Sequence, residues 1–367
     1  MRNNNCLGIV FCNTGDDNMA ELTSLRTMSS VPFGCRYRMV DFALSAFVNA
    51  GISKVGLVTK RNFQSLADHV GSGRYWDLAR KKGGLHILSP YSSVTTGVYK
   101  GKIDALYSCI SYLEKSSEEY VFVADANVIA NIDLEKMIEE HIKTAADITI
   151  AYKKGILGDD YVKLDGKRII GFATSKSTDE NKENCSLNIM LLKKDLLISL
   201  ISEANLHNYT NLNVDILQRK VAEFVINGYE VKGYASVINN MQSYFDTNMA
   251  LLDKTIRESV FNMERPVYTK LRDDMPARYG FDSDVSDSLI ADGCLIEGTV
   301  KNSIIFRGVH IGKNAKVENC IIMQSAEIGD GTQLSYVIAD KNVTFKEGRT
   351  LVGCRSFPLV IGKGLTV

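Results

Sequence analysis

The stretch that decides the fold begins at residue 7. Residues 7–23 read Leu-Gly-Ile-Val-Phe-Cys-Asn-Thr-Gly-Asp-Asp-Asn-Met-Ala-Glu-Leu-Thr, and residues 31–37 read Val-Pro-Phe-Gly-Cys-Arg-Tyr. An apolar run, Leu7–Cys12, enters a polar turn with Gly15, and a helical pattern follows the second segment. This order is typical of a first strand that delivers a loop to a nucleotide, where glycines let backbone N–H groups approach phosphates and a cation holds the charge. The loop carries two aspartates that would face the phosphates and no basic residue, so its chemistry argues against such a site.

Length and composition exclude several classes of function. The 367 residues are enough for two domains, and a hydrophobic content of 45% can fill a sizeable core. The formal net charge is zero, which gives no electrostatic reason to expect nucleic acid or an anionic membrane as a partner. No apolar run approaches the roughly 20 residues that span a bilayer, and the N-terminus lacks the apolar core of a signal peptide. We therefore expect a cytoplasmic protein.

The cysteines predict neither a metal cluster nor a disulfide framework. The chain has eight cysteines and five histidines, and no two cysteines form a Cys-x-x-Cys pair. Reduced and mostly buried thiols are the expected state.

The first two-thirds of the chain alternate between strand and helix patterns, which predicts an α/β domain with a mainly parallel sheet and helices on both faces. The expected strands after the first are 54–59, 85–88, 120–124, 148–152, 168–174, 187–192 and 229–235, and the expected helices are 37–50, 63–70, 104–113, 134–144, 213–226 and 241–252. Ligands of such sheets bind at the carboxyl ends of strands. This rule points to the loops after Phe11, Thr59 and Ala124.

The last third is a repeat. Apolar pairs recur every seventeen residues, at Ile311 and Val317, Ile328 and Leu334, and Phe345 and Leu351, with Cys294 and Val300 one interval earlier. Coils of seventeen residues with three short sides indicate a left-handed parallel β-helix, and the segments 311–314 and 328–331 suit its corners because small residues permit unusual backbone angles. A small β-sandwich is the alternative. The predicted organisation is a domain over 1–252, a linker over 253–280 and the β-helix over 281–367.

Four spaced blocks identify a family. They are the residues 31–45, 49–52, 68–73 with 76–78, and 243–252, which include Val-Pro-Phe-Gly-Cys-Arg-Tyr-Arg-Met-Val-Asp-Phe, Asp-His-Val-Gly-Ser-Gly and Ser-Tyr-Phe-Asp-Thr-Asn-Met-Ala-Leu-Leu. Together they closely resemble ADP-glucose pyrophosphorylase, also called glucose-1-phosphate adenylyltransferase, of bacterial glycogen synthesis, over nearly the whole chain. The resemblance implies a nucleotidyltransferase (Rossmann-like) domain followed by the β-helix. It also implies adenylyl transfer from ATP to glucose 1-phosphate with Mg²⁺ and release of pyrophosphate.

The positions that handle phosphate in the family are altered here. The family's first loop reads Gly-Gly-x-Gly-x-Arg, and its arginine corresponds to Asn18. The lysine of the family's Lys-Pro-Ala-Val-Pro corresponds to Met28. The first metal aspartate corresponds to Asn127 and the second to Val237. An amide is a poorer Mg²⁺ ligand than a carboxylate, and valine is none.

The resemblance leaves a remnant of the ligand pocket. Its expected members are Gly15, Gly101, Asp104, Asp125, Ser186 and Asp215, whereas Lys176 cannot be assigned because the gap before it is uncertain. Asp125 lies two residues before Asn127, and a two-residue shift along a strand moves a carboxylate about 6–7 Å, too far to replace the metal ligand unaided.

The main hypothesis is a regulatory, catalytically impaired subunit without catalytic or metal-binding residues of its own. It would bind the catalytic ADP-glucose pyrophosphorylase subunit, which holds the Mg²⁺, as a heterotetramer, and form a homo-oligomer when alone. One alternative is an active nucleotidyltransferase that holds its metal with Asp104, Asp125 or Asp215. Another is a stand-alone sensor of sugar phosphate or nucleotide, with Lys60, Arg61 and Lys102 as new cations near the pocket, although solvation at the surface is the commoner role of such residues.

Overall fold

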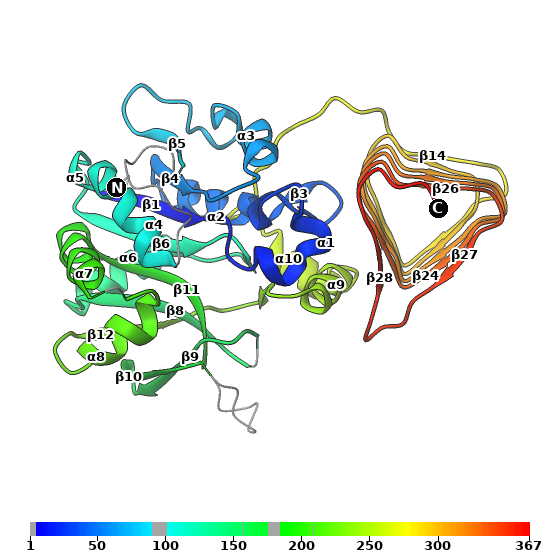
Figure 1. Cartoon of the computed structure of the whole chain (residues 1–367). Helices are drawn as coiled ribbons and strands as arrows, with labels where there is room; N and C mark the ends of the chain where they lie inside the picture. The colour runs from blue at the N-terminus through cyan, green and yellow to red at the C-terminus, as the bar shows by residue number, and fades with distance from the viewer. Residues whose placement is uncertain (1–4, 90–100, 156, 175–183, 208) are drawn as a thin grey trace. The chain divides into compact units, whose positions relative to one another are not determined.

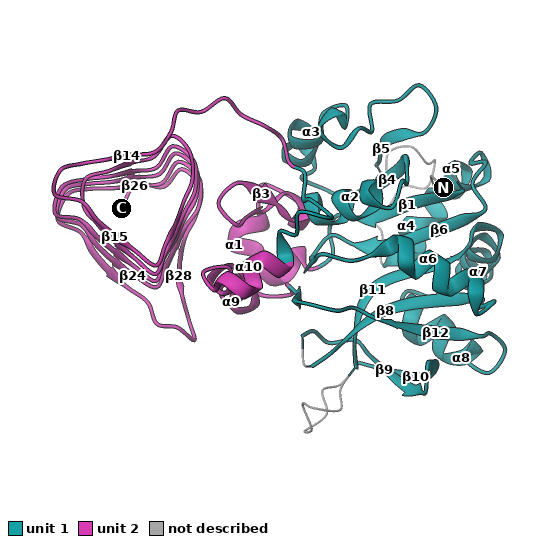
Figure 2. Cartoon of the chain, turned by 180° about the vertical axis from the view of Figure 1, so that it is seen from behind, with its two compact units in different colours: residues 1–14, 40–237, 260–268 teal, residues 15–39, 238–259, 269–367 magenta. Residues whose placement is uncertain are grey.

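The computed structural model describes residues 5–89, 101–155, 157–174, 184–207 and 209–367. The chain forms two compact units (Figure 2). Unit 1 comprises Met1–Thr14, Val40–Val237 and Val260–Tyr268, and unit 2 comprises Gly15–Met39, Ile238–Ser259 and Thr269–Val367.

Unit 1 is built on a nine-stranded sheet with the order β5-β4-β1-β6-β11-β8-β12-β10-β9 (Figure 1). Its strands are β1 (Cys6–Phe11), β4 (Lys54–Val58), β5 (Gly84–Leu88), β6 (Tyr120–Asp125), β8 (Ile148–Lys154), β9 (Tyr161–Asp165), β10 (Arg168–Ala173), β11 (Asn184–Lys193) and β12 (Ile226–Glu230). The expected parallel arrangement holds from β5 to β6 and between β8 and β12. β11 runs antiparallel to both of its main neighbours, and β9 and β10 form an antiparallel hairpin, so the whole sheet is mixed.

The register brings three strand ends together. Phe11 at the end of β1 is level with Val58 of β4 and with Asp125 of β6. Because these three strands are parallel, the loops that follow them leave the same edge of the sheet. The three loops to which the strand-end rule points therefore lie at one edge of the sheet.

Helices cover both faces of this sheet, as predicted. Leu7 and Ile9 of β1 belong to one hydrophobic core and Val10 to the other, since side chains alternate along a strand. The Val10 side holds α2 (Met39–Asn49), α3 (Gln64–Val70) and α6 (Leu134–Lys143), whereas the other side holds α4 (Lys102–Ser108), α5 (Ile110–Glu114), α7 (Lys194–Leu206) and a π-helical turn over Leu212–Leu217.

Some elements differ from the predicted ones. The expected helix over 104–113 is broken at Cys109 into α4 and α5. The helix predicted over 213–226 is confirmed only over its first part: the π-helical turn and α8 (Gln218–Lys220) end well before β12 begins. The strand predicted over 229–235 is two strands, β12 and β13 (Ala235–Val237), of which β13 pairs with β7 (Val128–Ala130).

A glycine in β12 allows this strand to pack against β8. A Cβ on Gly228 would lie 2.9 Å from the ring of Tyr152 in the neighbouring β8, so this strand needs a residue without a side chain. The apolar pattern that predicted a later start could not show this contact, because it depends on the partner strand.

Unit 2 contains three five-stranded parallel sheets, which form the predicted left-handed β-helix and exclude the sandwich (Figure 1). The sheets have the orders β14-β17-β20-β23-β26, β15-β18-β21-β24-β27 and β16-β19-β22-β25-β28. Their strands are β14 (Arg278–Tyr279), β15 (Asp284–Ser286), β16 (Leu289–Ile290), β17 (Leu295–Ile296), β18 (Thr299–Lys301), β19 (Ile304–Ile305), β20 (His310–Ile311), β21 (Lys316–Glu318), β22 (Ile321–Ile322), β23 (Glu327–Ile328), β24 (Gln333–Ser335), β25 (Val337–Ala339), β26 (Thr344–Phe345), β27 (Thr350–Val352) and β28 (Leu359–Ile361).

The seventeen-residue register is confirmed for most coils and wrong for one residue. Ile311 is level with Ile328, and Val300 with Val317. Ile296, rather than Cys294, is level with Ile311. The reason is a shorter corner, because two residues separate β17 from β18 and four separate β20 from β21.

The corners use small residues for two different reasons. Asn314 and Gly331 adopt left-handed backbone angles with φ of 56° and 67° at equivalent places in successive coils. Gly329 is required by close approach instead, because a Cβ on it would lie 2.6 Å from the backbone nitrogen of Glu347 in the next coil. The expected role of small residues at the corners is confirmed.

Two of the family-like sequence blocks contact each other in unit 2. The hairpin of β2 (Pro32–Phe33) and β3 (Tyr37–Arg38) lies against α9 (Met241–Ala250). The Tyr244 hydroxyl donates to the Pro32 carbonyl at 2.7 Å, and the Gly34 N–H donates to the Asn248 side chain at 3.0 Å. These blocks are therefore packing motifs.

Seven of the eight cysteines are buried, as predicted, and Cys354 is exposed. Burial raises the pKa of the Cys6 and Cys320 thiols to about 12, so these thiols stay protonated at neutral pH. Within the described ranges, no helix combines the length and the apolar composition that crossing a bilayer requires.

The lysine that follows Asp340 gives unit 2 a pH-dependent stability. Burial, then the charges of Arg38 and Arg26, lower the pKa of Lys341 to about 6. Since the unfolded chain keeps this amine protonated up to its ordinary pKa of 10.5, the unfolded state binds more protons between pH 6 and pH 10, and stability rises with pH across that window. We expect Lys341→Met to stabilise the protein, with a gain that shrinks by about 0.5–1 kcal/mol per pH unit from pH 6 to pH 9.

Denaturant unfolding of both proteins at several pH values measures this difference. Lys363→Met, at an exposed position of the same unit, is the control, for which we expect no trend with pH. A gain for Lys341→Met that stays constant with pH would contradict the assignment.

Candidate functional site

A pocket lies where β1, β4 and β6 end. It consists of two adjoining cavities of about 210 and 370 Å³. We call it the strand-end pocket. Both cavities are lined by Thr14, Gly101 and Lys102. The other lining residues are Phe11, Asn13, Val58, Thr59, Lys60 and Ala105 in the smaller cavity, and Val123, Asp160, Asn188, Met190, Thr210, Asn211, Leu212 and Asn213 in the larger one.

The carboxylate at the end of β6 is neutralised by the chain itself. Asp125 is 2% exposed, and its Oδ2 accepts a hydrogen bond from the Lys102 ammonium at 2.6 Å. Its Oδ1 accepts from the Thr14 hydroxyl at 3.1 Å. The ammonium also lies 5.5 Å from the centre of the Phe11 ring, in reach of a cation–π contact. Lys102 is thus an ion-pair partner of a buried acid, and the expectation that it only solvates the surface is wrong.

These residues do not fit the Mg²⁺ that the family fold implies. Both oxygens of Asp125 are engaged by donors of the chain, one of them cationic, and a second cation beside that ammonium would be repelled. Asn127 is buried and neutral, and Val237 pairs with Val128 in the small sheet of β7 and β13. Within the described parts of the chain, no group of three or more His, Cys, Asp or Glu side chains could hold a metal ion.

The larger cavity is lined by a chain of neutral and acidic side chains. The Asn188 amide donates to the Asp160 carboxylate at 2.8 Å and accepts from the Asn213 amide at 2.9 Å. Asn188 has a left-handed φ of 51°, and its N–H donates to the Ser186 hydroxyl at 3.2 Å. Ser186 is buried and does not line either cavity, but its bond positions Asn188, which does.

None of the three expected acids is among the described residues that line this pocket, and Asp125 is linked to it through its bonds to Lys102 and Thr14. The Asp215 carboxylate accepts from the backbone N–H groups of Thr210 and Asn211 at 3.0 and 2.9 Å. These bonds lower the pKa of Asp215, and they hold a loop that does line the pocket. Asp104 lies in the first turn of α4. Gly101 lines both cavities, and a Cβ on it would lie 2.5 Å from the Thr210 carbonyl oxygen, so a larger residue would push the two segments apart.

The loop positions that belong to unit 2 also lack phosphate-binding chemistry. Gly15 has a φ of 88° and precedes the 3₁₀ turn Asp16–Met19, in which Asn18 is exposed. Met28 is fully buried, and its N–H donates to Asp16 Oδ1 at 2.7 Å. Asp16 therefore binds the backbone of its own loop, and the expectation that it faces phosphates is wrong.

The other basic residues expected near the strand-end pocket differ in whether they line it. Lys60 lines the smaller cavity, and its N–H donates to the Asn13 side chain at 2.6 Å. Arg61 is exposed, as expected for a solvated cation. Lys176 lies outside the described residues.

The sequence did not reveal the partners of Asp125 or the amides around Asn188. Thr14 and Lys102 are far from Asp125 in the chain. The pairing of β1 with β6 brings Thr14 close to Asp125, and the start of α4 brings Lys102. The sequence did point to this segment, because Asn188 lies two residues after Ser186, an expected member of the pocket.

Comparisons with known proteins agree with this architecture. The nucleotidyl transferase family model matches residues 18–172, and the model of the GlmU-like C-terminal hexapeptide matches residues 275–355. The chain is 33% identical to the glycogen biosynthesis protein GlgD of Bacillus subtilis over 366 residues, which covers 100% of this chain and 98% of that protein.

Two relatives from Geobacillus stearothermophilus are similarly close. GlgD of that organism is 36% identical over 86% of this chain and 83% of its own length. Its glucose-1-phosphate adenylyltransferase is 32% identical over 85% of this chain and 83% of its own length. The chain therefore belongs to the ADP-glucose pyrophosphorylase (glucose-1-phosphate adenylyltransferase) family, which includes these relatives.

Proposed function

We propose that this chain serves in glycogen biosynthesis as a regulatory, catalytically impaired subunit of glucose-1-phosphate adenylyltransferase. The observation that carries the proposal is the ion pair of Asp125 with Lys102, at the edge of the sheet where the family chemistry needs a metal-binding carboxylate. An internal ammonium at that place satisfies the carboxylate without a metal ion. An enzyme with a rearranged metal site would need Asp104, Asp125 or Asp215 available at the pocket. Asp104 and Asp215 do not line it, and the carboxylates of Asp125 and Asp215 accept hydrogen bonds from the chain.

The proposed partner is the catalytic subunit, which makes ADP-glucose from ATP and glucose 1-phosphate and holds the Mg²⁺. We propose a heterotetramer with that subunit and a homo-oligomer of this chain alone. The retained family-like blocks support this proposal, since Tyr244 and Asn248 hold the hairpin of β2 and β3 in this chain while the phosphate-handling positions are altered. Activation requires only that this chain contact the active state of its partner better than the inactive state.

The test mixes this chain with the glucose-1-phosphate adenylyltransferase encoded in the same genome. Size-exclusion chromatography of the mixture is expected to show one species larger than either protein alone. The rate of ADP-glucose formation is expected to exceed that of the partner alone by about 5-fold to 150-fold, the range of typical allosteric coupling. An unrelated protein at the same concentration is the control.

Separate elution together with an unchanged rate would refute the proposal. Co-elution without any change in rate or in the response to small-molecule effectors would leave a complex but refute the regulatory role.

A further inference from the structure

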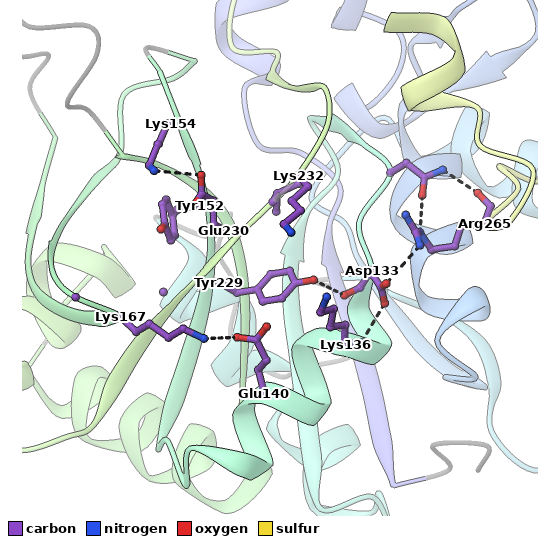
Figure 3. A pocket seen from close by; sticks show the side chains of 14 residues that line it. Asp133, Lys136, Glu140, Tyr152, Lys154, Lys167, Tyr229, Glu230, Lys232 and Arg265 are labelled. Carbon is purple, nitrogen blue, oxygen red and sulfur yellow. Dashed lines mark hydrogen bonds and ion pairs between the residues drawn. The ribbon is translucent and has the colours of Figure 1, made fainter. Parts of the chain in front are cut away.

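A second pocket in unit 1 shares no lining residue with the strand-end pocket. It has a volume of about 530 Å³ and lies between α6, the ends of β8 and β12, the turn between β9 and β10, and Arg265 (Figure 3). We call it the α6 pocket. Its volume falls within the range of about 300–1,000 Å³ that is typical of small-molecule sites.

Ion pairs build the walls of the α6 pocket. Arg265 donates to Asp133 at 3.3 Å and to Asn131 at 3.0 Å, and Asn131 in turn donates to the Arg265 carbonyl at 2.8 Å. On the opposite wall, Lys167 pairs with Glu140 at 3.0 Å and Lys154 with Glu230 at 3.4 Å (Figure 3). Each acid in the pocket is thus matched to one cation.

Two lysines that line the pocket are not part of these three ion pairs. Five basic and three acidic side chains line the pocket: Lys136, Lys154, Lys167, Lys232 and Arg265, against Asp133, Glu140 and Glu230. Neither Lys136 nor Lys232 forms an ion pair with any residue in the described part of the chain. Figure 3 shows both side chains in the middle of the pocket, beside Tyr229 and between the two paired walls. The pocket therefore carries an excess of two positive charges at its centre.

The pocket also offers polar and aromatic surface for an organic group. Burial, then the charges of Asp133 and Glu140, raise the pKa of Tyr229 to about 12, so its hydroxyl stays protonated at neutral pH and donates to the Asp133 carbonyl at 3.2 Å. Tyr152 packs its ring over Gly228. Glu140 and Glu230 are 34% and 44% exposed, and each has oxygen lone pairs left to accept from hydroxyl groups.

We propose that the α6 pocket binds a phosphate monoester of a small hydroxylated molecule, such as a sugar phosphate. A phosphate monoester carries about −1.5 to −2 charges at neutral pH, which matches the two lysines without acidic partners. Inorganic phosphate alone is much smaller than the cavity, so the remaining volume accommodates the hydroxylated part. This site is independent of the proposed regulatory function, because it requires neither a partner subunit nor catalysis.

Isothermal titration calorimetry of the full chain with glucose 6-phosphate tests this inference. We expect saturable binding of glucose 6-phosphate, affinity at least tenfold lower for inorganic phosphate, and no heat with glucose. Lys136→Ala and Lys232→Ala are each expected to lower the affinity for glucose 6-phosphate about tenfold, because each removes one of the two cations. Lys143→Ala, at an exposed position in the last turn of the same helix, is the matched control and should leave the affinity unchanged.

Four results would overturn the proposal. One is the absence of binding by any phosphate compound. The second is equal affinity for succinate, which would show a general dianion site rather than a phosphate site. The third is equal affinity for inorganic phosphate, which would show that the hydroxylated part of the ligand does not contribute to binding. The fourth is an equal loss of affinity in the Lys143 control, or no loss in either pocket variant, which would place the binding elsewhere. Circular dichroism verifies that each variant is folded.

Discussion

Arg26→Met is expected to destabilise the protein by about 3–5 kcal/mol, the cost of leaving a buried charge without its partner. Arg26 donates through both terminal nitrogens to the two carboxylate oxygens of Asp340, at 2.9 and 2.7 Å. The side chains are 3% and 2% exposed, so water cannot replace the lost donor. After the substitution, the Lys341 N–H is the one donor among the described residues that still bonds to this carboxylate. The free energy of unfolding in urea measures the loss.

Two further variants show whether the buried charge causes the loss. Arg26→Met combined with Asp340→Leu should recover more than half of the stability, because no isolated charge is left. Lys301→Met breaks an exposed pair with Asp284 in the same unit and should cost less than about 1 kcal/mol. Equal losses for Arg26→Met and Lys301→Met would contradict this explanation.

Lys102→Ala is expected to cost about 2–3 kcal/mol. The substitution removes the cation that neutralises Asp125, whose carboxylate is 1% exposed. The Thr14 hydroxyl still donates to that carboxylate but carries no charge. The expected loss is smaller than for Arg26 because Lys102 is itself 30% exposed and makes one bond rather than two. Denaturant unfolding of unmodified chain and variant gives the difference.

The matched control is Lys60→Ala, since Lys60 lines the same pocket but bonds through its backbone N–H. Its cost should stay below about 0.5 kcal/mol. The double variant with Lys102→Ala and Asp125→Asn should be more stable than Lys102→Ala alone. If the Lys102 and Lys60 variants were equally stable, the ion pair would not be the group that satisfies Asp125.

The fold could be predicted from the sequence where the signal is local or periodic. The apolar run at Leu7–Cys12 gives a strand buried on both faces, and the recurrence of Ile311, Ile328 and Phe345 gives the coils. The misplaced Cys294 shows the limit of this reasoning, because a corner shortened by two residues shifts the register without disturbing the apolar pattern.

The helix α7 shows a different limit. It was not predicted, although Leu197, Leu200, Ile201 and Ala204 have helical spacing and are buried. The short apolar run Leu196–Ile198 alone does not separate helix from strand, and the helical period appears only over the longer window that includes Ser199, Ser202 and Glu203.

The candidate site was predictable by position and less so by chemistry. The rule of strand ends located the pocket, and comparison with the family pattern located Asn127 and Val237. The pairing of Asp125 with Lys102 was not predictable, because it depends on how the start of α4 approaches the end of β6. No sequence motif predicted the α6 pocket, because its lining residues come from five separate segments of the chain.

The central claim is that the adenylyl-transfer chemistry has been lost from this site. The most direct test is the rate of ADP-glucose formation by the purified chain with ATP, glucose 1-phosphate and Mg²⁺, beside a catalytic relative under the same conditions. We predict a rate at least about 10⁴-fold below that relative, because each missing charge-stabilising group costs about two to three orders of magnitude. A rate within a hundredfold of the relative, lost on Asp125→Ala, would contradict the claim.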